Sequence, residues 1–139
     1  MRRRHRGDQA CLWDMLKASR SARDIAGTHT KEQYDSDQLL RLAAERLVEI
    51  LGEAARHVTL AFKREHPEIP WRRITEQRHL LAHEYDIIDP ELMWVLISRR
   101  LDALIAALEP LVPAPPRDAE EPPLAPATRA GLARRGSCS

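Results

Sequence analysis

Residues 66–85, HPEIPWRRITEQRHLLAHEY, decide how the chain folds, because they contain a helix break and the helix that follows it. Pro67 and Pro70 stop the preceding helix, since proline lacks a backbone donor and disfavours helical geometry in the residue before it. The chain must therefore cross in an extended form before a short helix begins, which we predict over residues 71–83. Trp71 is expected to close one end of the resulting bundle.

Three further helices are predicted from apolar side chains that recur every three or four positions. The first covers about residues 9–25. The second covers about residues 37–65 and is capped by Ser36, and the fourth follows its own cap, Asp89. Four helices with one apolar face each predict an all-α, up-and-down bundle as a single domain over residues 9–111.

Polar segments connect and flank these helices. Gly27 is expected to end the first helix, and residues 28–36 form a polar connection that Tyr34 can anchor. Residues 1–8 form a basic end. Residues 112–139 are rich in proline and poor in apolar side chains, so we predict a disordered tail.

The composition limits the function classes. The chain has 139 residues, a net charge of +1 and only 4% aromatic residues, so no global field attracts nucleic acid. RNA binding would need a local basic surface, for which the candidates are Arg72, Arg73, Arg78, Arg99 and Arg100. The two cysteines lie near opposite ends and match no metal or disulfide pattern, and no run is long enough to span a membrane. These features favour a soluble cytoplasmic protein.

The chemistry is concentrated at the end of the predicted helix 71–83. Arg78 can hold a phosphate in a planar fork, His83 can transfer protons near neutral pH, and Tyr85 adds a hydroxyl that can be modified. At helical spacing Arg78 and Tyr85 share one face, with His83 at its margin. The alternative is a solvated arginine, a hydrogen-bonded histidine and a partly buried tyrosine.

The surroundings of this motif resemble a known family. The segment PEIPW precedes it, Arg78 is followed after four residues by His83 and then by Tyr85, and the second helix carries LGEAA at residues 51–55. Together these features resemble the HepT-like proteins of the HEPN superfamily, the toxin halves of HepT/MNT toxin–antitoxin pairs. The resemblance extends from about Cys11 to Leu111.

The resemblance implies a type VII-like toxin that cleaves RNA without a metal or other cofactor. It assigns Arg78 and His83 to a ribonuclease centre that leaves a 2′,3′-cyclic phosphate. It implies a homodimer in which two copies of the motif meet. It also implies that a partner nucleotidyltransferase, the MNT antitoxin, adenylylates Tyr85. Two alternatives stay open: a non-catalytic HEPN module that binds RNA or nucleotide, and a structural helical subunit.

Several neighbouring residues have two interpretations each. His79 stands where relatives usually carry Asn or Asp, so it either shares in proton transfer or lies on the surface. Glu53 either orients Arg78 or His83, or is a solvated or capping glutamate. Arg72 and Arg73 either bind flanking phosphates or form a solvated face.

Gly52 lies inside the second helix, where glycine costs up to about 1 kcal/mol relative to alanine. Its presence indicates close packing against another helix or a slight bend, unless it is simply tolerated. His57 and His66 are interpreted as surface or capping residues.

Overall fold

The computed structural model describes the backbone of residues 7–83 and 89–113, and the side chains of these residues except 79–83. The described residues form helices and turns, with no strand among them, which confirms the prediction of an all-α fold. The elements are α1 (Asp8–Thr28), α2 (Lys31–Ser36), α3 (Gln38–His57), α4 (Leu60–Glu65), α5 (Trp71–His83), α6 (Pro90–Val95), a π-helical turn (Leu96–Arg100), α7 (Leu101–Leu108) and a 3-10 turn (Glu109–Leu111).

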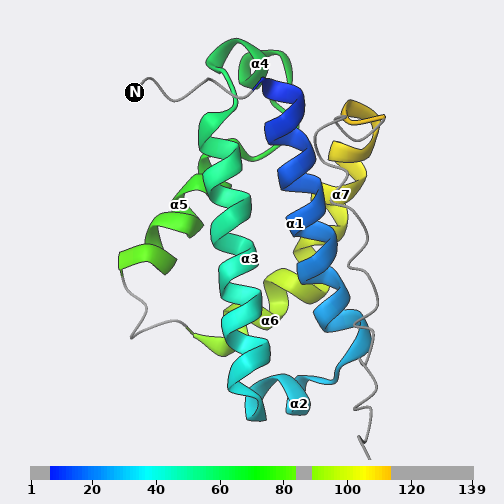
Figure 1. Ribbon diagram of the computed structural model, residues 1–139, viewed down its shortest axis with the longest axis vertical. Helices are drawn as coiled ribbons and strands as arrows, with labels where there is room; N and C mark the ends of the chain where they lie inside the picture. The colour runs from blue at the N-terminus through cyan, green and yellow to red at the C-terminus, as the bar shows by residue number, and fades with distance from the viewer. Residues whose placement is uncertain (1–6, 84–88, 114–139) are drawn as a thin grey trace, which may run out of the picture.

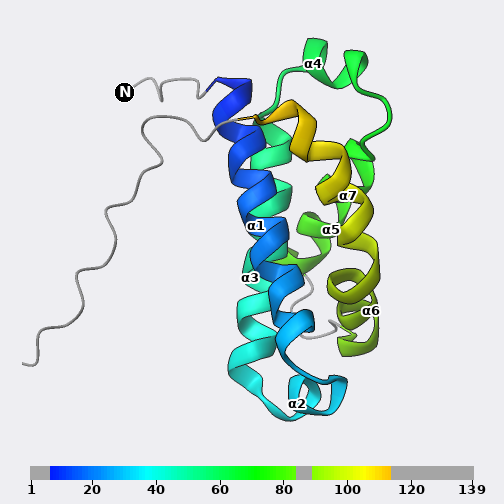
Figure 2. The same ribbon diagram turned by 90° about the vertical axis from the view of Figure 1, so that its right-hand side faces the viewer.

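The long helices α1 and α3 run side by side in opposite directions and form the centre of the bundle (Figure 1). α7 packs against α1 on one side, and α5 packs against α3 on the other. The short helices α2 and α4 lie at opposite ends of the bundle, as the turned view in Figure 2 also shows. α5 is therefore attached to the rest of the described structure mainly through α3.

The core lies between α1, α3 and the helices from α6 to α7. Its fully buried side chains are mostly aliphatic, which suits close packing of helices. They include Leu12, Met15, Leu16, Val48, Leu51, Ile97, Leu101 and Leu108. The predicted apolar stripes therefore face one shared core.

The connection predicted over residues 28–36 is wrong in part, because it contains the helix α2. Thr30 and Gln33 form a capping box at its start, in which each side chain bonds the other residue's backbone N–H. Tyr34 is fully buried and its ring lies 5.4 Å from that of Trp94, which confirms it as the anchor.

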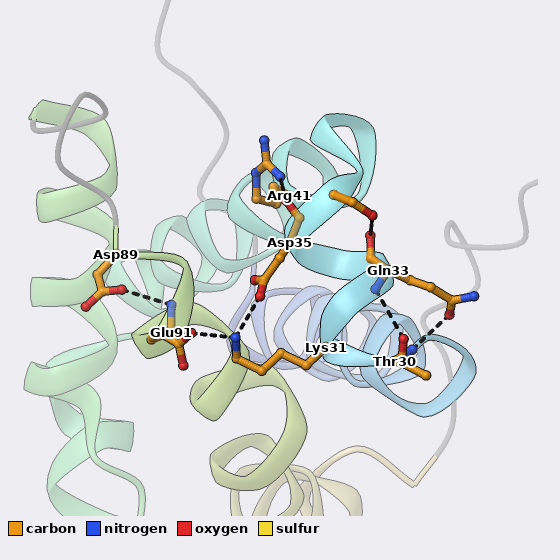
Figure 3. Close-up of polar contacts among 8 residues, drawn as sticks. Thr30, Lys31, Gln33, Asp35, Arg41, Asp89 and Glu91 are labelled. Atoms are coloured by element: carbon orange, nitrogen blue, oxygen red, sulfur yellow. Dashed lines mark hydrogen bonds and ion pairs between the residues drawn. The ribbon is translucent and has the colours of Figure 1, made fainter.

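A charged cluster ties α2 to α6 (Figure 3). Lys31 Nζ lies 2.6 Å from Asp35 Oδ2 and is also ion-paired with Glu91. Asp89 caps α6 by accepting from Glu91 N at 2.9 Å, as predicted. These contacts hold the start of α6 beside α2.

The continuous second helix predicted over residues 37–65 is wrong. α3 ends at His57, and Thr59 begins α4 by accepting a hydrogen bond from Phe62 N at 3.3 Å. Asp8 accepts from Thr59 N at 2.8 Å and from Thr59 Oγ1 at 2.7 Å, so a residue from α1 satisfies the donors at the break.

Two helix ends also differ from the prediction. Asp37, and not Ser36, caps α3, because its carboxylate accepts from Leu39 N at 2.9 Å while Ser36 Oγ donates to Gln33 O. α1 continues through Gly27 to Thr28, since a glycine in helical conformation need not end a helix. The predicted helix over 71–83 is confirmed as α5, whereas the predicted tail lies mostly outside the described residues.

Candidate functional site

The backbones of α3 and α5 approach each other closely where Gly52 faces Arg78. A Cβ atom added to Gly52 would lie 2.2 Å from Arg78 Cβ and 3.1 Å from Ile74 O. Carbon atoms in contact are normally about 3.5–4.0 Å apart, so only glycine permits this approach. Of the interpretations of Gly52, close helix packing is therefore confirmed, and it fixes the place from which the Arg78 side chain starts.

Glu53, the next residue on α3, contacts the guanidinium of Arg78. Glu53 Oε2 lies 2.7 Å from Arg78 Nη2, and the two side chains are 37% and 28% exposed. The two opposite charges form an ion pair, and Glu53 Oε2 accepts no hydrogen bond from a described residue. Arg78 Nε is buried and has no hydrogen-bond partner among the described residues, so Glu53 makes the main polar contact that the structure assigns to this guanidinium.

The other carboxylate oxygen of Glu53 binds two residues of the last turn of α3. Arg56 Nη2 donates to Glu53 Oε1 at 3.1 Å, and His57 Nε2 donates to the same oxygen at 2.9 Å. The pKa of Glu53 is lowered from its usual value, first by the hydrogen bond from Arg56 and further by His57 and by the charge of Arg78. The carboxylate is therefore ionised at neutral pH and joins α3 to α5.

Sequence reasoning did not place Arg56 or His57 beside the motif. Both follow Glu53 by three or four residues, a spacing at which helical side chains meet. This helical spacing is the feature of the sequence from which the contacts of Arg56 and His57 with Glu53 could have been predicted. The contact between Glu53 and Arg78 could not be found in the same way, because it depends on how α5 packs against α3.

The remaining candidate residues are placed as follows. Arg72 and Arg73 are exposed near the start of α5, and Arg72 Nε donates to Glu76 Oε1 at 2.9 Å, which agrees with a solvated face. His79 and His83 belong to the helical backbone of α5, but their side chains lie outside the described residues. Tyr85 lies outside the described residues altogether.

The described part of the chain offers neither a metal site nor a membrane-spanning helix. Among residues whose side chains are described, no three His, Cys, Asp or Glu side chains are grouped so that they could hold a metal ion. None of the described helices combines the length and apolar character needed to cross a membrane.

The all-α bundle of the described residues, with Arg78 and His83 both in the α5 backbone, is consistent with a HEPN-like helical protein. The chain belongs to the HepT-like family, because the profile described as "Ribonuclease HepT-like" matches residues 15–111.

Two relatives of the chain have names that refer to ribonucleases. The chain is 35% identical over 80 residues to "Probable ribonuclease HepT" of Thermococcus cleftensis, covering 58% of this chain and 73% of that protein. It is 28% identical over 90 residues to "Putative RNase MJ1380" of Methanocaldococcus jannaschii, covering 65% and 83% of the two chains. No solved structure matches the chain significantly.

Proposed function

We propose that the chain is a metal-independent endoribonuclease and the toxin of a type VII-like toxin–antitoxin pair. The observation that carries the proposal is the position of Arg78. It is half-buried on α5, is ion-paired with Glu53, and precedes His83 by five residues in a chain of the HepT-like family. The names of the relatives, which designate them as ribonucleases, support RNA as the substrate.

RNA carries its own nucleophile, the 2′-hydroxyl. In the proposed reaction His83 takes the proton of this hydroxyl, whose oxygen attacks the adjacent phosphorus. Arg78 stabilises the charge that develops on the phosphate oxygens. The bond to the 5′-oxygen of the next nucleotide breaks, and a protonated group supplies the proton to that leaving oxygen. The products are a 2′,3′-cyclic phosphate and a 5′-hydroxyl.

A homodimer would supply the second proton-transfer group. One copy of the motif offers His83, with His79 as a further candidate, whereas two copies that meet would offer His83 twice. The surface supports association, because Leu39 and Leu42 of α3 are 77% and 52% exposed and Leu92 of α6 is 69% exposed. An interface of this kind buries on the order of 1,200–2,000 Å² in total.

Arg72 and Arg73 would contact flanking phosphates of the RNA. Both are exposed on α5, the helix that carries Arg78. The ion pair of Arg72 with Glu76 is also exposed, so a phosphate could replace this carboxylate at little cost.

The ribonuclease activity would be controlled by modification of Tyr85, the proposed target of an MNT-type nucleotidyltransferase. AMP on this hydroxyl would add bulk and negative charge two residues from His83. Its phosphate could pair with Arg78 and so consume the cation intended for RNA.

Cleavage by variants of the purified protein tests the proposal. We expect the parent to cleave single-stranded RNA and His83→Ala to lose cleavage while retaining its fold. His66→Ala is the matched control, because His66 lies in the connection between α4 and α5 and its Nδ1 is 3.0 Å from Glu68. If circular dichroism shows that it keeps its fold, it should cleave like the parent. A parent that binds RNA without cleaving it would favour the non-catalytic module, and a parent that does neither would favour a structural subunit.

A further inference from the structure

We propose that Glu53 is the positioning residue for Arg78, so that α3 sets which edge of the guanidinium faces the RNA. The inference rests on the proposed function, since it assigns the direction from which the phosphate binds. It adds that Arg56 and His57, which hold Glu53, belong to the site. Three features support this role: α3 packs against the Arg78 backbone, Glu53 contacts the Arg78 guanidinium, and Arg56 and His57 bind the Glu53 carboxylate.

The Arg78 side chain begins at a fixed place. Its Cβ lies where a side chain at position 52 would stand, so the two helix backbones are in direct contact at this point. Glu53 is the adjacent residue of α3, and its carboxylate reaches the guanidinium at 2.7 Å. Both ends of the Arg78 side chain are thus located by α3.

The guanidinium has one engaged edge and one available edge. Nη2 contacts Glu53, and Nε beside it is buried. Nη1 makes no hydrogen bond to any described residue, so none of the described side chains competes with a phosphate oxygen for its two N–H groups. A long arginine side chain otherwise has many rotamers, so this single ion pair selects among them.

Glu53 itself has little freedom, because its second oxygen accepts from both Arg56 and His57 on its own helix. The charges remain favourable for a phosphate. Two guanidinium groups against one carboxylate give the cluster a net charge of +1, even with His57 neutral. Glu53 can therefore orient Arg78 without cancelling the positive charge of the site.

If Glu53 positions Arg78, Glu53→Gln should have the opposite effect to the one expected if Glu53 only neutralises part of the positive charge of the site. Removing a negative charge would by itself strengthen RNA binding. Loss of positioning would instead lower the rate of the chemical step, since a misplacement of about 1 Å can cost roughly 10²-fold. The split between kcat and KM separates the two. Because an unfolded fraction would also lower the apparent kcat at unchanged KM, the folded fraction of each variant is measured by circular dichroism and kcat is expressed per folded protein.

The experiment compares Glu53→Gln and Glu53→Asp with Glu49→Gln. Glu49 lies one turn earlier on α3 and pairs with Arg46 at 3.2 Å on the surface, so it matches the change in charge outside the site. We expect Glu53→Gln to lower kcat by roughly 10- to 100-fold with KM within about twofold. Glu53→Asp should recover part of the loss, and Glu49→Gln should match the parent. A Glu53→Gln protein with the parent's kcat would overturn the inference.

A second readout does not depend on cleavage. NMR relaxation of the Arg78 Nε–H group should report a rigid side chain in the parent and in Glu49→Gln, and a mobile one in Glu53→Gln. A side chain that is equally rigid in all three proteins would overturn the positioning role, whether or not the parent cleaves RNA. A parent that does not cleave, with this NMR difference present, would overturn only the proposed function.

Discussion

Replacing Gly52 with alanine should destabilise the protein, although alanine is normally the better residue inside a helix. The added Cβ would stand 2.2 Å from Arg78 Cβ, and normal carbon contacts of about 3.5–4.0 Å require α5 to retreat by more than about 1 Å. Arg78 Cβ is attached directly to the backbone, so no flexible side-chain end can absorb the movement. α5 as a whole must shift.

The magnitude follows from two opposing effects. Overpacking typically costs about 1–3 kcal/mol, and glycine-to-alanine replacement in a helix gains roughly 0.5–1 kcal/mol. The net loss in the free energy of unfolding is therefore about 0–2.5 kcal/mol. For a domain of this size that loss corresponds to a fall in Tm of up to about 10 °C. RNA cleavage should fall further than stability, because the shift moves Arg78 itself.

Gly27→Ala is the matched control for this thermal-melting assay. A Cβ at position 27 would meet only Arg23 Nη1, at 3.2 Å, which is the far end of a flexible side chain. This variant should therefore be as stable as the parent or gain roughly 0.5–1 kcal/mol. A Gly52→Ala protein that melts above the temperature of the parent, as expected for the control, would refute the close contact between α3 and α5.

Three further predictions test other parts of the molecule. Burial raises the pKa of Tyr34 to about 12, so the folded state disfavours its ionisation. Protonated Tyr34 contributes fully to the free energy of unfolding below about pH 10, and this contribution is lost as the pH rises to about 12. In Tyr34→Phe, the free energy of unfolding measured by denaturant titration should therefore fall less over this pH range. Tyr85→Phe should fold normally but gain no AMP from the cognate nucleotidyltransferase and ATP, as judged by intact mass; full modification would place the site elsewhere. Light scattering at micromolar concentration should give the mass of a dimer, and a strict monomer would contradict the shared centre.

Local sequence signals predicted the parts of the fold that local chemistry controls. The prolines before Trp71 fixed the start of α5, and Asp89 capped α6 as expected because an aspartate before Pro90 satisfies free backbone donors. The buried Tyr34 was also found from sequence, since it is an aromatic residue in an otherwise polar segment.

Contacts between distant residues account for two features that the sequence did not predict. The break between α3 and α4 depends on Asp8, whose carboxylate binds Thr59 from 51 positions away. The continuous apolar pattern of residues 37–65 contained no sign of it. In the same way, the sequence left two interpretations of Glu53, and the packing of α5 on α3 was needed to place it against Arg78.

The chemistry of the cut ends tests the proposed ribonuclease most directly. Purified protein would be incubated with a defined single-stranded RNA in EDTA, and the product ends would be identified by mass spectrometry. We predict fragments that end in a 2′,3′-cyclic phosphate and begin with a 5′-hydroxyl, and no such fragments with Arg78→Ala or His83→Ala. Cleavage that stops in EDTA and returns with magnesium, or that leaves 5′-phosphates, would contradict a mechanism in which the RNA 2′-hydroxyl attacks beside Arg78.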